Sequence, residues 1–359
     1  MRPWVPHVDM DQFIAAVELL RRPELVGVPV IVGTSADPTQ RAVVMTATYE
    51  ARAHGIRSGM PLRTAHRKCP EAVLLPVDHA HYEEASAVVM ATLRAHPGAT
   101  VEVLGWDEAF VGIETDDPAA QARAIQAEVL AATGLQCSIG IGATLVRAKT
   151  ATDFGKPQGV YQLTRETWLD VMGDRPTSAL WGIGPRIAAR LDGLGLHTVR
   201  DLAGADSPSL QAAFGPATGP HLIALGRGEG RHTVDDTPWV ARAHGHETTF
   251  QRDLTEPAEI DAALHELAGA VVADLRSEGR ACARVHLKVR FRPFWTVTRV
   301  RTLSAPTLDA GVVAETAAAL LAALDQDGRP IRLLGIRGDM VPPPGGYDPP
   351  RSHGRRGAP

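Results

Sequence analysis

Apolar and polar positions follow two different periods along the chain, and together these periods predict alternating helices and strands. Segments with helical spacing are residues 12–25, up to a break near Pro23, and residues 80–95 and 118–133. Segments typical of buried strands are residues 29–33, 42–47 and 137–142. Shorter helices are expected to begin near Tyr49 and after Pro61. This order predicts an α/β or α+β first half, in which residues 80–95 and 118–133 each cover one face of a sheet.

Two further apolar runs end in acidic residues. An apolar run near the N-terminus leads to Asp9 and Asp11, and residues 101–106 lead to the adjacent pair Asp107 and Glu108. We expect both runs to be short strands with the acids at one end. A solvated strand end is the ordinary explanation for any single acid. Carboxylates drawn together, however, repel each other and lose hydration, which is costly unless cations neutralise them. Oxygen ligands with no Cys or His cluster nearby favour Mg²⁺ or Mn²⁺ over zinc.

The character of the chain changes at residues 179–191. Gly182 and Gly184 form a Gly-x-Gly hairpin that leads into a helix with Pro185 in its first turn, which is a favoured place for proline. A second helix start follows within residues 194–202. This arrangement resembles a helix-hairpin-helix element, whose exposed backbone N–H groups hold a nucleic-acid phosphate. A simple tight connection between two helices explains the pattern equally well.

A strand with one apolar and one basic face is predicted at residues 285–291, because apolar and basic residues alternate there. Residues 293–295 are expected to turn the chain into a second strand over residues 296–301. No acid interrupts residues 280–301. A solvated face usually mixes both signs, so one sign over both strands fits contact with a phosphate backbone. The basic residues that we expect to contact DNA are Lys288, Arg290, Arg292, Arg299 and Arg301.

The composition is that of an ordinary globular protein with several domains. The chain has 359 residues, 44% of them hydrophobic and 22% charged, which suggests two to four domains. The net charge of −4 argues against a nucleic-acid partner on average, so the local basic run carries that argument. Neither a membrane span nor a signal peptide is expected. The three cysteines lie far apart in the sequence, without metal or disulfide spacing, and a reducing cytoplasm is the expected location.

Up to about residue 340, the chain resembles a Y-family, DinB-type translesion DNA polymerase. Each motif alone is a weak signal, but their order and spacing are specific. The motifs that carry the resemblance are residues 7–18, 46–52, 59–62, 106–110, 148–151 and 155–159.

The resemblance implies an α+β multidomain fold with the right-hand architecture of polymerases. The implied parts are a palm at residues 1–11 and 79–167, fingers at 12–78, a helix-hairpin-helix thumb at 168–233, a linker at 234–244, and an α/β little finger at 245–340. Residues 341–359 have low complexity and are expected to be disordered.

The resemblance also implies the site. Asp9, Asp107 and Glu108 would be the catalytic acids and would hold two Mg²⁺ ions, with the Met10 carbonyl as a further ligand and Mn²⁺ as a substitute. Two such ions can activate a primer 3′-hydroxyl and stabilise the leaving pyrophosphate. The residues that match nucleotide contacts of the family are Phe13, Ile14, Thr46, Tyr49, Arg52 and Lys156. Packing of Tyr49 and a pair between Arg52 and an acid such as Glu50 are the structural alternatives.

The clearest departure from the family pattern is Ile14, where an aromatic ring usually blocks the 2′-hydroxyl of the incoming sugar. A branched aliphatic side chain is shorter and has no flat ring. We therefore hypothesise weak discrimination against ribonucleotides, so that NTPs are used as well as dNTPs. The alternative is that Phe13 or a shift of the backbone restores the exclusion.

Smaller departures concern phosphate contacts and recruitment. Gly105 and Trp106 replace the usual residues before the acidic pair. Thr144 and Leu145 stand where an Asn-Lys pair is common, which weakens one expected phosphate contact. The C-terminal tail has no Gln-x-x-Leu-x-Phe-like segment, so docking on a sliding clamp is doubtful.

These features predict a monomeric, low-fidelity DNA polymerase that extends primers past damaged templates. Its partners would be primer-template DNA, dNTPs and NTPs, without a membrane. Two other classes are weighed against it. A DNA-binding scaffold without activity would normally have lost the metal acids, and a nucleotidyl cyclase would need neither the hairpin thumb nor the basic C-terminal domain.

Overall fold

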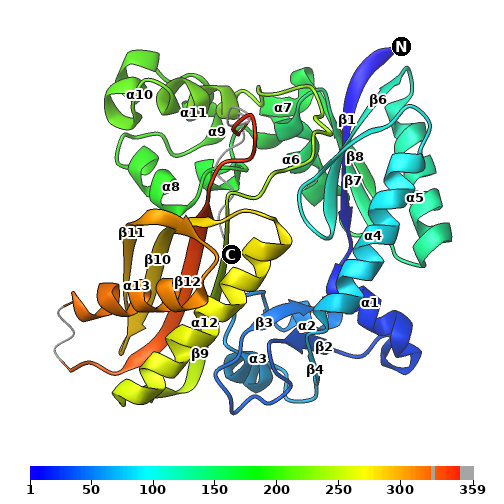
Figure 1. Ribbon diagram of the computed structural model, residues 1–359. Helices are drawn as coiled ribbons and strands as arrows, with labels where there is room; N and C mark the ends of the chain where they lie inside the picture. The colour runs from blue at the N-terminus through cyan, green and yellow to red at the C-terminus, as the bar shows by residue number, and fades with distance from the viewer. Residues whose placement is uncertain (325–327, 348–359) are drawn as a thin grey trace. The chain divides into compact units, whose positions relative to one another are not determined.

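The computed structural model describes residues 1–324 and 328–347, and the chain forms two compact units. The first unit contains Met1–Pro38 and Ala42–Thr237, and the second contains Thr39–Arg41 and the described residues of the stretch 238–347 (Figure 1). No described helix combines the length and the apolar character needed to cross a membrane.

The first unit is built on a five-stranded sheet with the order β5-β6-β1-β7-β8. The central strand β1 runs antiparallel to both of its neighbours, β6 and β7, whereas β7 and β8 are parallel. The strands are β1 (Arg2–Met10), β5 (Thr100–Val103), β6 (Glu108–Thr115), β7 (Cys137–Gly142) and β8 (Val160–Leu163). The expected strands at residues 4–8 and 137–142 are confirmed, and β6 and β8 were not predicted.

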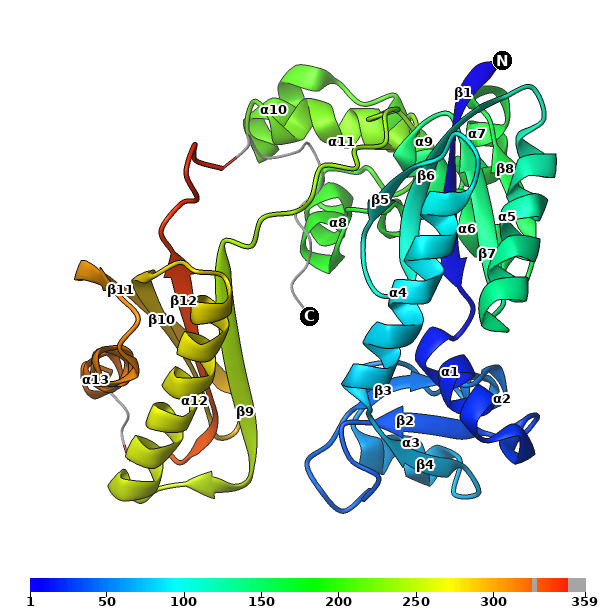
Figure 2. The same ribbon diagram turned by 45° about the vertical axis from the view of Figure 1, so that its right-hand side comes forward.

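The predicted helices α4 (His79–Ala95) and α5 (Pro118–Thr133) lie on one face of the sheet and share a core with it (Figure 2). The prediction that each covers a face of this sheet is therefore confirmed, and it is the same face for both helices. The other face is covered by α6 (Leu145–Gly155). A Cβ at Gly140 would lie 2.1 Å from the Ala148 carbonyl oxygen, so this glycine permits the close approach of α6.

A smaller three-stranded sheet with the order β3-β2-β4 follows β1 in the chain. Thr48 begins α2 by accepting a hydrogen bond from the Ala51 backbone N–H. The expected helices and strands are confirmed, with an end before Pro23, and β4 was not predicted. The elements are α1 (Phe13–Arg21), a 3₁₀ helix (Pro23–Leu25), β2 (Val30–Gly33), β3 (Val44–Ala47), α2 (Tyr49–Ala53), α3 (Leu62–Lys68) and β4 (Val73–Pro76).

A group of short helices completes the first unit around the buried side chain of Trp168. The predicted helix starts are confirmed, because α8 begins at Pro185 and Thr198 caps the start of α9. The helices are α7 (Arg165–Met172), a 3₁₀ helix (Thr177–Ala179), α8 (Pro185–Asp192), α9 (Val199–Ala203), α10 (Ser207–Phe214) and α11 (Thr218–Gly226).

The second unit is an antiparallel four-stranded sheet with the order β11-β10-β12-β9 and two helices on one face (Figure 2). Alternate side chains of β10, from Val285 to Phe291, are fully buried against these helices, as the alternation predicted. The elements are β9 (Ala243–Leu254), α12 (Pro257–Ser277), β10 (Cys282–Phe291), β11 (Trp295–Thr307), α13 (Ala310–Ala322) and β12 (Ile331–Met340).

Two expected irregular segments are partly ordered. Strand β9 begins at Ala243, inside the expected linker 234–244. In the expected tail, the Val341 backbone N–H donates to the Ala281 carbonyl at 3.0 Å, and the Tyr347 ring lies 4.7 Å from the Arg242 guanidinium carbon. Residues 341–347 of the expected tail therefore contact the second unit at both of their ends. The remaining tail, 348–359, lies outside the described residues.

Candidate active site

The predicted acids meet at one end of the central strands, although by a different route from the one expected. Strand β5 ends at Val103, so the run 101–106 is not one strand. Asp107 lies in a tight turn and Glu108 opens β6, directly opposite Asp9 of β1. The Gly105 backbone N–H donates to the Glu108 carbonyl at 3.3 Å and closes this turn. Because β1 and β6 pair in this register, all three acids are brought together.

The backbone of Met10 joins the same cluster. Its N–H donates to the Asp107 carbonyl at 2.8 Å, which ties β1 to the turn that carries the acid. The Met10 side chain is buried in the apolar core beneath the sheet. Its backbone therefore lies among the acids while its side chain anchors the strand.

The two adjacent acids have opposite pKa shifts. Burial, and after it the charges of Asp9 and Glu108, raise the pKa of Asp107 to about 6. Burial also opposes ionisation of Glu108, but a hydrogen bond from His7 and the charge of Lys149 outweigh it and lower the pKa to about 2. The crowding of negative charge at Asp107 is what a bound cation would relieve.

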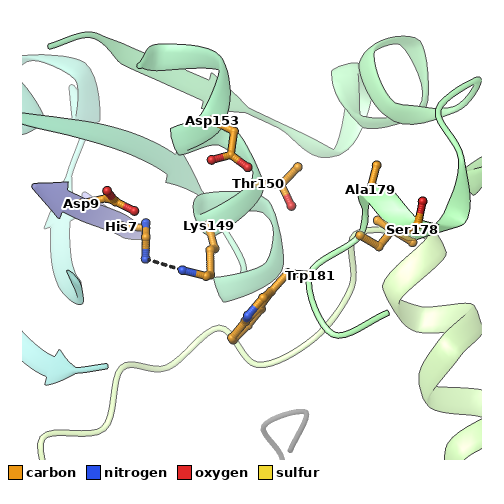
Figure 3. Close-up of a pocket in the computed structure, with 9 residues that line it drawn as sticks. His7, Asp9, Lys149, Thr150, Asp153, Ser178, Ala179 and Trp181 are labelled. Atoms are coloured by element: carbon orange, nitrogen blue, oxygen red, sulfur yellow. Dashed lines mark hydrogen bonds between the residues drawn. The ribbon is translucent and has the colours of Figure 1, made fainter. Parts of the chain in front are cut away.

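Two lysines neutralise part of this charge. Lys156 Nζ lies 2.7 Å from an Asp9 carboxylate oxygen, and Lys149 forms an ion pair with Glu108. Lys149 also lies 3.3 Å from His7 Nε2, and Figure 3 shows this contact beside Asp9. The sequence interpretation assigned no role to His7 or Lys149. Their positions inside two of the motifs were the available signal.

A cavity of about 220 Å³ opens next to these groups, between β1, α6 and the segment around the 3₁₀ helix Thr177–Ala179 (Figure 3). Asp9, Lys149 and Asp153 contribute charged side chains to its lining. Trp181 forms part of its wall, with its ring centroid 5.8 Å from Lys149 Nζ. The cavity is thus polar on the side of Asp9.

Asp11, the remaining acid of the first run, is almost fully buried and has a structural role. Its carboxylate accepts hydrogen bonds from the Tyr49 hydroxyl at 3.0 Å, the Ser138 hydroxyl at 2.9 Å and the Gln158 backbone N–H at 2.8 Å. These donors come from α2, from β7 and from the loop after Lys156. Asp11 therefore connects three segments that carry site residues.

Replacing Asp11 with alanine should destabilise the first unit by about 2–4 kcal/mol, because three buried donors lose their acceptor. The midpoint of urea unfolding measures the change. Ser138→Ala removes only one of the donors and should cost about 1 kcal/mol. Equal effects of the two substitutions would contradict this role of Asp11.

The expected phosphate-binding side chains lie together on β3 and α2. The Arg52 guanidinium donates to the Ala47 carbonyl at 2.9 Å and to the Thr46 hydroxyl at 3.2 Å. Its carbon lies 5.3 Å from the centroid of the Tyr49 ring. Burial raises the pKa of the Tyr49 hydroxyl, as does the charge of Asp11, so this hydroxyl is a neutral donor. No contact between Arg52 and Glu50 takes the place of these interactions among the described hydrogen bonds and ion pairs.

The two residues at the expected sugar position differ in environment. Phe13 is 3% exposed and belongs to the apolar core, together with Val8 and Val32. Ile14 is half-buried and packs only at the margin of that core. The Phe13 ring is therefore committed to packing, and the side chain nearer the surface is the aliphatic one.

The unusual pair at the start of α6 has a structural explanation. Thr144 caps the helix by accepting from the Arg147 N–H, and its hydroxyl donates to the Gly228 carbonyl at 2.9 Å. Leu145 is buried against Val5 and Phe110. These two residues hold the segment after α11 against the sheet. Neither can contact a phosphate as the lysine usual at this place in the family would. Trp106, which also departs from the family pattern, packs edge-on against the ring of His79, with the ring centroids 5.5 Å apart.

The glycine hairpin before α8 has the predicted form. Gly182 and Gly184 are exposed, while Ile183 between them is buried and anchors the turn. Gly182 has a φ of +94°, which favours glycine, and a Cβ at Gly184 would meet nothing within 4 Å. The backbone at Gly184 is thus open to approach at the first turn of α8.

The basic residues of the second unit lie on both faces of its sheet, and their expected contact with DNA stays a prediction. Lys288 and Arg290 pair with Thr298 and Thr296 on the face without helices. Arg299 and Arg301 pair instead with the buried residues Leu287 and Val285, so their side chains leave the sheet on the opposite face. Arg292 lies in the turn, outside the paired register. Because the turn has three residues, odd-numbered positions of β10 pair with odd-numbered positions of β11. Lys288 and Arg290 are even-numbered whereas Arg299 and Arg301 are odd-numbered, so the two pairs lie on opposite faces.

Acids also interrupt the basic face. Lys288 Nζ lies 2.5 Å from a Glu247 carboxylate oxygen in an ion pair. Gly335 lies between these two residues in the sheet, and because it has no side chain their side chains can meet above it. The Asp339 carboxylate, 10% exposed, lies 2.9 Å from each of Arg284, His286 and Arg337. Burial opposes ionisation of Asp339, but His286 and then the arginines outweigh it and lower its pKa.

Replacing Asp339 with asparagine should destabilise the second unit by about 1–2 kcal/mol at neutral pH. The folded-state pKa of Asp339 is lower than its ordinary value of 3.8, so its stabilising effect is complete above that pH and is lost as the pH falls below it. The difference in the free energy of unfolding between the wild-type and Asp339→Asn proteins, measured with urea, should therefore become smaller in acid. Glu266→Gln, which removes an exposed charge from α12, should show no such pattern. A difference independent of pH would contradict the assignment.

The comparisons with known proteins show the family of the chain. The impB/mucB/samB family matches residues 8–153, and its C-terminal domain matches residues 241–343. The chain is 48% identical to "DNA polymerase IV 2" of Mycobacterium tuberculosis (strain ATCC 25618 / H37Rv), over 94% of this chain and 98% of the relative. It is 38% identical to "DNA polymerase IV" of Methanoculleus marisnigri, over 94% of each.

Solved structures show the same fold. A Y-family DNA polymerase chimera of Dbh and Dpo4 superposes with a TM-score of 0.83 at 23% identity, over 94% of this chain and 98% of the chimera. An insertion ternary complex of Dbh DNA polymerase superposes with a TM-score of 0.64 at 24% identity, over 94% and 99% of the chains.

The fold and the site define a DNA-directed DNA polymerase with α+β architecture. The chain belongs to the impB/mucB/samB family, and within it to the DinB-type, Y-family translesion polymerases.

Proposed function

We propose that Asp9, Asp107 and Glu108 hold two Mg²⁺ ions, with the Met10 carbonyl as a further ligand and Mn²⁺ as a possible substitute. The supporting observation is the meeting of three carboxylates at the β1 and β6 ends, where Asp107 has a raised pKa. A set of carboxylate and carbonyl oxygens fits a hard cation. When bound, such ions would lower the pKa of the primer 3′-hydroxyl and neutralise the charge that develops on the pyrophosphate.

The residues of the chain would position the nucleotide for that reaction. Arg52, oriented by Thr46, and Lys156 would contact the triphosphate as cations, and Tyr49 would donate a hydrogen bond. In the described state Lys156 lies against Asp9 and Lys149 against Glu108. Lys156 would contact the phosphates when Asp9 serves as a metal ligand and no longer pairs with it.

We propose that the sugar pocket accepts ribonucleotides. Two observations support this proposal: Ile14 is aliphatic and half-buried, and Phe13 is buried. Because the Phe13 ring packs in the core, it is not available to block the 2′-hydroxyl in place of an aromatic residue 14. Without a flat ring against the sugar, a 2′-hydroxyl meets less steric exclusion.

The right-hand parts are proposed as a palm at 1–11 and 79–167, fingers at 12–78, a thumb at 168–233 and a little finger at 245–340. The exposed backbone at Gly182 and Gly184 would hold a phosphate of the duplex. Arg290, on the face without helices, would follow the DNA backbone with Lys288. Such contacts give salt-sensitive binding with little sequence preference. We propose that the enzyme works in this way as a monomer.

Single-nucleotide extension of a labelled primer-template in Mg²⁺ tests this function. The polymerase should add the nucleotide complementary to the next template base and should change its choice when that base is changed. A product that ignores the template, or tight binding of DNA without extension, would contradict it.

A further inference from the structure

Three residues with metal-ligating side chains meet in the fingers, away from the catalytic acids. His54 caps the C-terminal end of α2, Cys69 caps the C-terminal end of α3, and Glu71 follows two residues later. One potential ligand atom of each lies within 4.8 Å of those of the other two, and His54 Nε2 is 3.9 Å from a Glu71 oxygen. The end of α2 and the end of α3 therefore converge on one small group.

The thiol at the centre of this group is buried and hydrogen-bonded. Cys69 is free of disulfides and its residue is fully buried. Burial raises the pKa of its thiol, and so does the hydrogen bond that the thiol donates to Glu71. A hydrogen bond from the Ala72 backbone N–H acts in the opposite direction and favours the thiolate. A cation would replace the thiol proton and remove the cost of the buried charge.

We propose that His54, Cys69 and Glu71 form a site for Zn²⁺ or a chemically similar divalent cation. Imidazole, thiolate and carboxylate are the ligand types that zinc takes in tetrahedral sites. Bonds of roughly 2.0–2.3 Å place tetrahedral ligand atoms roughly 3.3–3.8 Å apart. The present separations, up to 4.8 Å, are thus too long by about 1.5 Å at most, and the side chains of His54 and Glu71 are exposed enough to close in. Water would complete the coordination. On binding, the sulfur–hydrogen bond breaks, a sulfur–metal bond forms and the proton goes to solvent.

The bound cation would hold the ends of the two helices together. The short helix α2 also carries Tyr49 and Arg52, so the cation would stiffen the element from which these side chains project. This proposal is independent of the sugar pocket and of the catalytic metals, because none of its ligands belongs to those sites.

Titration of the full chain with Co²⁺ tests the proposal, because a cobalt–thiolate bond gives a near-ultraviolet charge-transfer band that carboxylate sites do not give. We expect the band in the wild-type protein and in the control Cys282→Ser, which removes another buried thiol, and its loss in Cys69→Ser. Added Zn²⁺ should displace the cobalt and abolish the band.

His54→Gln and Glu71→Gln test the other two ligands and keep the proposal testable even if Cys69→Ser fails to fold, because both side chains are exposed. Each should weaken cobalt binding, followed by the band, at least about tenfold. Absence of the band in the wild-type protein would overturn the proposal. So would an unchanged band in Cys69→Ser, or affinities that neither glutamine substitution alters.

Discussion

Replacing Asp107 with alanine should reduce primer extension by roughly 10³-fold or more, while binding of primer-template DNA is retained. The reason is that Asp107 is the most crowded acid of the cluster, where burial and two neighbouring carboxylates raise the pKa to about 6. Loss of a ligand at the reacting phosphate removes several kcal/mol of transition-state stabilisation. Steady-state insertion of one dNTP measures the activity, and fluorescence anisotropy measures the DNA affinity.

Glu114→Ala is the matched control for this experiment. Glu114 lies on the same strand β6 as Glu108 but is exposed, with its Cα opposite Pro3 at the other end of β1. Its loss should leave insertion within about twofold of wild type, as expected for an exposed position. Insertion at the wild-type rate by the Asp107→Ala protein would contradict the proposal that these acids take part in the reaction.

Replacing Ile14 with phenylalanine should raise the preference for dNTP over NTP by about a hundredfold, mainly by lowering insertion of the ribonucleotide. An aromatic ring at this half-buried position would stand against the sugar, whereas Ile14 packs only at the edge of the core. The ratio of kcat/KM for one dNTP and its NTP partner measures the effect. The rate of dNTP insertion should remain close to that of wild type.

Ile14→Leu separates ring shape from disturbance of the helix. Leucine keeps an aliphatic side chain at the first turn of α1, so the sugar preference should stay close to that of wild type. A Phe substitution that changes both nucleotides equally, or a Leu substitution that acts like Phe, would mean that residue 14 does not contact the sugar.

The local elements could be predicted because their residues carry strong local signals. The alternation of Val285, Leu287 and Val289 with polar residues fixes one buried face of β10. Likewise Pro185 marks the first turn of α8, and Pro23 lies just beyond the end of α1. Each signal acts within a few residues, so the sequence alone contains it.

What could not be predicted depends on contacts between distant segments. The apolar stretch that includes Leu104 and Trp106 concealed the turn that places Asp107 between two strands, although Gly105 was a turn signal. Similarly, periodicity shows that α4 and α5 each have a buried face, but it does not say on which side of the sheet either helix lies.

The three acids of the candidate site were named from their motifs, whereas their partners were not. Lys149 and His7 neutralise and orient Glu108 through contacts across 41 residues of chain or more. The opposite directions of Arg299 and Lys288 depend on the length of the turn between β10 and β11. Counting basic residues along the sequence could not reveal either arrangement.

The measurement that tests this account most directly is insertion of dNTP and of the matching NTP by the wild-type polymerase, opposite the same template base in Mg²⁺. We predict template-directed insertion of both nucleotides, with a modest preference for the dNTP. A preference of about 10⁴-fold or more for the dNTP would contradict the open sugar pocket at Ile14 and leave the polymerase in place. Insertion of neither nucleotide, despite tight binding of the DNA, would contradict the catalytic site itself.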